Sequence, residues 1–193
     1  SVLEPTSVLG VYSSTRFASA FSSVARTHHT LWIAFPDLGI GKLSLETPEQ
    51  VDMEPEFAFL EQTQGCQVKD VVSDGYAHLF ALVTCINSDS TSKIIHILDP
   101  PSGEETASIE SIVDIEGDFQ SLHWVRSMGL FASGSEGLVS ISEEGSTFFW
   151  VQVEDELSDV HAIGTRLILR TKSGLLWAGS LTEGFQQVRS DVG

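Results

Sequence analysis

The chain has 193 residues, of which 41% are hydrophobic and 19% charged, a composition typical of a folded domain rather than a disordered segment. Ten basic residues against 27 acidic ones give a formal net charge of −17, which argues against nucleic acid or an anionic membrane as a partner. The apolar runs are strand-sized and far shorter than the roughly 20 residues that cross a bilayer, so we expect no membrane insertion.

Short apolar runs separated by turn residues recur along the whole chain and predict an all-β protein. Four of these runs are the second strands of similar units: TLWIAF (30–35), HLFALV (78–83), GLFASG (129–134) and RLILRT (166–171). One strand precedes each run and two follow it, so each unit is expected to be a four-stranded antiparallel sheet. The units are predicted at 16–53, 64–111, 119–153 and 158–189, with 6–14 as one additional strand.

This repeat resembles the blades of the WD40-like and quinoprotein-like β-propeller superfamily. The best local match is IIHILDPPSGEE (94–105), in which Asp99 falls where the superfamily has an Asp after its Trp, although Leu98 replaces that Trp. The resemblance implies a single β-propeller or partial propeller of about four blades. Three arrangements are open: part of a larger ring, a closed four-blade ring, or a ring completed by a partner chain.

The stretch GLVSISEEGSTFFW (137–150) resembles the Asp-box, a short hairpin found in sialidases. Ile141, Glu143 and Phe148 replace the Ser, Asp and Trp of that motif. The stretch occupies the slot of a third strand, a turn and a fourth strand, so we interpret it as a structural hairpin of one blade. A glycan-binding or sialidase-like Asp-box propeller is the alternative to the function given below.

Many acidic residues are predicted to lie between the fourth strand of one blade and the first strand of the next. Such connectors lie at one face of a propeller, where like charges would focus a negative potential. We expect this face to bind a basic segment of another protein, and the domain to act as a non-catalytic interaction scaffold within a larger complex. The predicted partner-binding residues are Asp114, Glu116, Asp118, Glu154, Asp155, Glu156 and Asp159.

The motifs of catalysis and cofactor binding are missing from the sequence. The serines show no nucleophile elbow, and there is no Gly-rich phosphate loop. The histidines lack zinc-site spacing, and we expect His123 and His161 to form hydrogen bonds within blades. DIEGD (114–118) has the alternating carboxylates of a calcium loop without its closing Glu. We therefore predict no enzyme activity, no cofactor and no metal.

Two cysteines and the absence of a glycosylation sequon favour an intracellular protein, cytoplasmic or nuclear. A hairpin turn at Gly75-Tyr76 would place Cys66 opposite Cys85, and the two could then form a disulfide. A turn at Asp74-Gly75, the dipeptide that type I′ turns prefer, would not align them. We prefer the second register and expect two free thiols.

Overall fold

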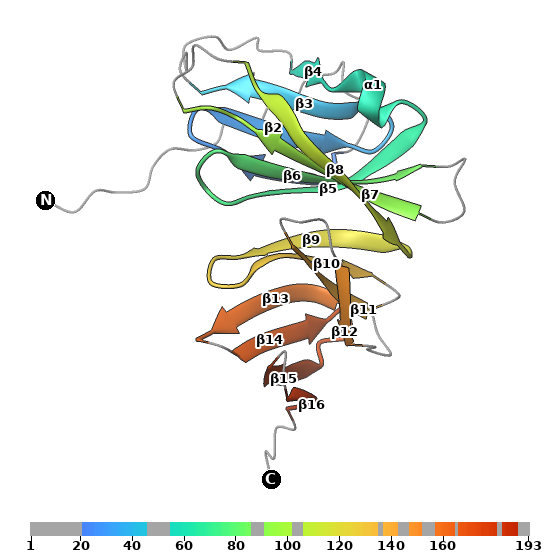
Figure 1. The fold of residues 1–193 in the computed structure, drawn as a ribbon, viewed down its shortest axis with the longest axis vertical. Coiled ribbons are helices and arrows are strands. Elements are labelled where there is room, and N and C mark those ends of the chain that lie inside the picture. The colour runs from blue at the N-terminus through green and yellow to red at the C-terminus, as the bar shows by residue number, and fades with distance from the viewer. Residues whose placement is uncertain are drawn as a thin grey trace, which may run out of the picture.

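The computed structural model describes residues 21–45, 55–85, 91–101, 106–134, 137–142, 147–151, 157–164, 166–180 and 183–188, with the backbone alone for 147–151. These residues form four separate four-stranded antiparallel sheets, in each of which the strands pair in chain order. The predicted all-β fold of propeller-type blades is thereby confirmed. The sheets are called blades 1 to 4, and Figure 1 shows them following one another from the blue to the red end of the chain.

The strand limits are as follows. Blade 1 holds β1 (Ser23–Arg26), β2 (Thr30–Phe35), β3 (Gly39–Ser44) and β4 (Glu56–Ala58), and blade 2 holds β5 (Cys66–Ser73), β6 (His78–Cys85), β7 (Thr91–Leu98) and β8 (Ser108–Glu116). Blade 3 holds β9 (Phe119–Val125), β10 (Gly129–Gly134), β11 (Gly137–Ile141) and β12 (Thr147–Val151), and blade 4 holds β13 (Leu157–Ile163), β14 (Arg166–Thr171), β15 (Leu176–Ser180) and β16 (Gly184–Gln187). A single helical turn, α1 (Leu60–Thr63), joins blades 1 and 2.

The hydrophobic core consists of three layers, one between each pair of neighbouring blades. Successive side chains of a strand point to opposite faces of its sheet, and β6 uses both faces. Leu79 and Ala81 are buried against blade 1, whereas Leu82 is buried against blade 3. In β10, Leu130 packs towards blade 2 and Phe131 towards blade 4. The middle blades are therefore covered on both faces, which explains why a central strand such as β6 (HLFALVTC) is mostly apolar.

A buried hydrogen-bonded cluster joins blades 1 and 2. The Thr27 hydroxyl donates to the Asp99 carboxylate, and the Trp32 indole N–H lies 3.1 Å from Thr27 Oγ1 and 3.2 Å from Asp99 Oδ2. Trp32 is fully buried, and its N–H needs an acceptor there. The Asp99 singled out in the sequence thus ties the end of β7 to the neighbouring blade.

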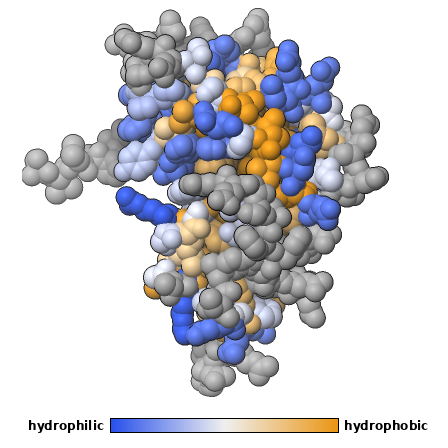
Figure 2. All heavy atoms as spheres, viewed as in Figure 1, coloured by the Kyte–Doolittle hydropathy of each residue, from blue (hydrophilic) through white to orange (hydrophobic). Residues whose placement is uncertain are grey.

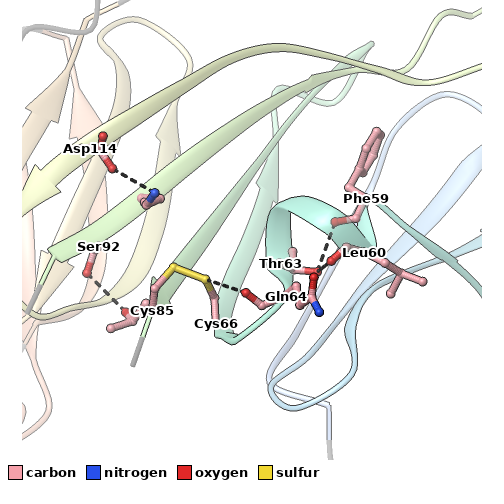
Figure 3. The surroundings of a disulfide bond; sticks show 10 residues. Phe59, Leu60, Thr63, Gln64, Cys66, Cys85, Ser92 and Asp114 are labelled. Carbon is pink, nitrogen blue, oxygen red and sulfur yellow. Dashed lines mark hydrogen bonds and ion pairs between the residues drawn. A yellow bond between two sulfur atoms is a disulfide. The ribbon is translucent and has the colours of Figure 1, made fainter. Parts of the chain in front are cut away.

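Cys66 and Cys85 form a disulfide, so the expectation of two free thiols is wrong. Asp74 N–H donates to the His78 carbonyl, and this pair closes a three-residue turn rather than either predicted two-residue turn. Gly75 adopts φ +84° in that turn. A β-bulge between Val68 and Asp70 then shifts the register by one residue, and Cys66 comes to lie opposite Cys85. Figure 3 shows the disulfide joining the start of β5 to the end of β6 beside α1.

Candidate interaction surfaces

The predicted acidic residues do not all lie in connectors. Asp114 and Glu116 belong to β8, because this strand continues past residue 111, where the sequence pattern placed the end of the second blade. Between β8 and β9 the connector consists of Gly117 and Asp118 alone. Glu154, Asp155 and Glu156 lie outside the described residues. The structure therefore moves two predicted connector residues to the outer edge of blade 2.

The acidic residues of β8 have a structural role that the sequence did not reveal. β8 is the last strand of blade 2 and carries Glu110, Asp114 and Glu116, all exposed. Charges on an edge strand hinder its pairing with another chain, and these carboxylates suit that purpose. Asp114 also lies 3.6 Å from the Lys93 ammonium of β7, an ion pair drawn in Figure 3. Figure 2 shows an apolar band over the region where Figure 1 places β7 and β8. Ile112 of β8 is one of the exposed large hydrophobic residues.

Asp159 lies apart from these residues, in the first strand of blade 4. Its Oδ2 is 2.9 Å from His161 Nε2 and 3.8 Å from an Arg170 guanidinium nitrogen. Its Oδ1 accepts the N–H of Val160. The structure therefore surrounds this carboxylate with basic groups, and it is not brought together with the acids of β8. Among the described residues, no group of three or more acidic, His or Cys side chains could hold a metal ion.

A cleft of about 350 Å³ opens between blades 3 and 4, at the turn that joins β9 to β10. Its lining includes Trp124, Arg126, Ser127 and His161. One face of the Trp124 ring stacks on Phe80, with ring centroids 5.4 Å apart. Arg126 is exposed, and the ion pairs within the described part of the chain do not include it. The cleft thus presents an exposed arginine in a strongly acidic protein, while the Trp124 ring itself packs in the layer between blades 2 and 3.

His123 lies behind this cleft and is held within its own blade. Its Nε2 is 2.8 Å from the buried Ser133 hydroxyl, and the within-blade hydrogen bonds expected for His123 and His161 are both confirmed. Burial lowers the pKa of His123 to about 4; nearby Asp159 opposes this shift and His161 adds to it. His123 is therefore neutral at physiological pH.

A four-residue motif that the sequence pattern did not reveal recurs at the first strand of every blade; in blade 1 it begins two residues before β1. An apolar residue is followed by a polar one, then by Ser or Asp, then by Val or Leu. In blades 2, 3 and 4 a β-bulge falls at the polar position, so the repeat is conformational as well as chemical. We call it the inner-strand motif: FSSV (21–24), VKDV (68–71), FQSL (119–122) and LSDV (157–160).

The two apolar positions of the inner-strand motif face the preceding blade. In blades 2 to 4 each is at most 6% exposed, because the blade before it covers the site. In blade 1 the equivalent Phe21 is 62% exposed and Val24 is 45% exposed. No described blade covers this outer face of blade 1. The same residue types are therefore buried in blades 2, 3 and 4 and exposed in blade 1.

The comparisons with known proteins show the fold and no family. The extracellular domain of a putative hybrid two-component system from B. thetaiotaomicron matches with a TM-score of 0.57 and 15% identity, over 89% of this chain and 23% of that one. This chain thus spans less than a quarter of that protein. Human WBSCR16 matches with a TM-score of only 0.35 at 11% identity, over 84% of this chain and 63% of that one, too little to support an argument. No protein-family model and no curated protein matches the sequence.

The expected intracellular location is corrected by these findings. A solved structure that the chain resembles is an extracellular domain. The expectation rested partly on the presence of only two cysteines. These two, Cys66 and Cys85, form a disulfide, and disulfides persist in oxidising compartments. No helix in the described ranges is long and apolar enough to cross a membrane.

Proposed function

We propose that this protein is a non-catalytic interaction scaffold that works as one part of a larger β-sheet assembly in an oxidising compartment. The observation that carries the proposal is the exposure of Phe21 and Val24, whose counterparts in blades 2 to 4 are interior. Leaving two large apolar side chains in water costs free energy, roughly 25 cal/mol for each Å² of apolar surface. A partner sheet that covers this face would recover that free energy, as each blade does for the next one.

The test is site-specific crosslinking. A photoreactive benzoylphenylalanine replaces Phe21 in the full protein, expressed in the cells that make it, and the crosslinked residues are mapped by mass spectrometry. We expect crosslinks to alternate residues of a β-strand, which is the pattern of one sheet face. The same probe at Tyr76, an exposed residue in the β5–β6 turn, serves as the control. No protein crosslink at position 21, or one indistinguishable from that at position 76, would refute the proposal.

The cleft between blades 3 and 4 favours a second candidate function, the binding of an acidic sugar. The exposed Arg126 guanidinium supplies paired donors that match the carboxylate of such a sugar. Titration with an oligomer of glucuronic acid, followed by tryptophan fluorescence, tests it. Arg126→Gln should abolish the response, whereas Arg166→Gln, at an arginine paired with Glu183, should preserve it. Equal responses from both variants would exclude the cleft. Binding of a basic segment by the acidic connectors stays a prediction.

A further inference from the structure

The last blade carries exposed apolar residues that correspond to interior ones. Strand pairing aligns His161 with Ile168 in blade 4 as it aligns His123 with Phe131 in blade 3. Phe131 is fully buried because blade 4 covers it, whereas Ile168 is only partly buried. Two residues further along the first strand, Val125 is 6% exposed and its counterpart Ile163 is 67% exposed. The outer face of blade 4 thus carries the residue positions that, in blade 3, pack against the next blade. The described residues include no blade after blade 4.

At two of the three blade junctions, a hydrogen bond from a backbone N–H to a side-chain oxygen links the inner strands. Val71 N–H of blade 2 donates to Ser23 Oγ of blade 1 at 2.8 Å, and Leu122 N–H of blade 3 donates to Asp70 Oδ2 of blade 2 at 2.7 Å. Donors and acceptors all belong to the inner-strand motif. At these two junctions the side chain at the third position accepts the N–H at the fourth position of the next blade. At the junction of blades 3 and 4 the Val160 N–H donates to Asp159 Oδ1 of its own blade.

Asp159 is the last acceptor of this series. Its Oδ1 accepts the N–H of the next residue, Val160, just as Asp70 Oδ1 accepts the N–H of Val71. Asp70 uses its other oxygen for the next blade, and Asp159 Oδ2 is held by His161 and Arg170 on the open side of blade 4. At the other end of the chain, Val24 occupies the donor position of the motif and has no preceding acceptor among the described residues. One chain thus carries an acceptor at blade 4 and a matching donor at blade 1.

We propose that two copies of this chain join head to tail, with blade 4 of each covering blade 1 of the other. The inference rests on the proposed function and names the partner sheet as a second copy. Each new contact continues the arrangement of the three existing layers, with Ile163 and Ile168 against Phe21 and Val24, and Asp159 accepting Val24 N–H. The two open faces lie at opposite ends of the molecule in Figure 1, so blade 4 does not cover blade 1 of the same chain. Two chains with four described blades each give eight, within the usual propeller range, and two-fold symmetry closes the ring.

Sedimentation equilibrium of the purified chain tests the proposal. We expect a species of twice 21.0 kDa, or 42 kDa, in equilibrium with the monomer. Val24→Asp and Ile163→Asp each place a charge in both contacts of the ring and should weaken the dimer at least about tenfold. Both positions are exposed in the monomer, so the variants should fold, and circular dichroism checks this. Leu60→Asp, at an exposed residue of α1, is the matched control and should dimerise like the wild type.

Mixing the two variants gives the decisive result. A Val24→Asp chain has an intact blade 4 face, and an Ile163→Asp chain has an intact blade 1 face. Their equimolar mixture should therefore dimerise more strongly than either variant alone, through the one undamaged contact. A monomer at every concentration, a mixture no tighter than its components, or an effect of Val24→Asp without one of Ile163→Asp would overturn the proposal. So would an open series of larger oligomers.

The crosslinking experiment separates this proposal from the function on which it rests. If residue 21 crosslinks to a sheet of a different protein while the purified chain stays monomeric, the second-copy proposal fails and the scaffold function stands. If residue 21 crosslinks to blade 4 of another copy, both stand. If it gives no specific crosslink, the scaffold function fails as well.

Discussion

Replacing His123 with Gln should remove a pH-dependent loss of stability. The folded protein holds this imidazole at a pKa of about 4, whereas an unfolded chain has a His pKa near 6.5. Above pH 6.5 both states are neutral, and His123 contributes no pH dependence. As the pH falls from 6.5 to 4, the unfolded chain binds a proton that the folded chain does not, so the protein is destabilised. At 1.36 kcal/mol per pH unit, the gap corresponds to about 3 kcal/mol once the pH is below 4.

Urea unfolding of the wild type and of His123→Gln at about pH 7.5, 6.5, 5.5 and 4.5 measures this effect. The many carboxylates titrate in both proteins, so they largely cancel in the difference between the two unfolding free energies. That difference should be constant above pH 6.5 and then shift in favour of the variant by about 2–3 kcal/mol at pH 4.5. Gln can keep a hydrogen bond to Ser133, which limits the structural cost of the change. A difference that stays flat down to pH 4.5 would show that His123 is protonated equally easily in both states.

Two further predictions concern the backbone. Reduction of the Cys66–Cys85 disulfide should lower the free energy of unfolding by up to about 3 kcal/mol, because the bond closes a loop with a sequence separation of 19. In urea unfolding, dithiothreitol should destabilise the wild type and leave a Cys66→Ala/Cys85→Ala variant unchanged. Equal effects of dithiothreitol on both proteins would contradict this prediction. Gly134→Ala should destabilise the protein by about 1–3 kcal/mol, because an added Cβ would lie 2.2 Å from the Asp118 carbonyl oxygen and 2.8 Å from Phe119 Cα. Thermal unfolding of the variant measures the effect. A midpoint equal to that of the wild type would show that the connector between β8 and β9 moves aside without loss of stability.

The sequence by itself determined the kind of sheet and the order of the strands. Alternation of side chains between two faces is a local property, so runs such as HLFALV and GLFASG indicate strands without knowledge of their neighbours. Turn residues between the runs dictate antiparallel pairing in chain order. The inner-strand motif was also present in the sequence, but its four copies share chemical character rather than identical residues.

Register and burial were decided by the tertiary structure. One bulged residue between Val68 and Asp70 determines whether Cys66 meets Cys85. The bulge falls at the polar position of the inner-strand motif, and that position is recognised as a bulge only from the strand pairing of several blades. The end of β8 depends on its pairing with β7, which carries Asp114 and Glu116 out of the connector and onto an edge strand. Phe21 and Phe119 are alike in sequence, yet one is open and the other interior, because burial depends on which sheet lies opposite. A residue's own neighbours in the chain specify its strand, whereas its exposure is specified by the blade that packs against it.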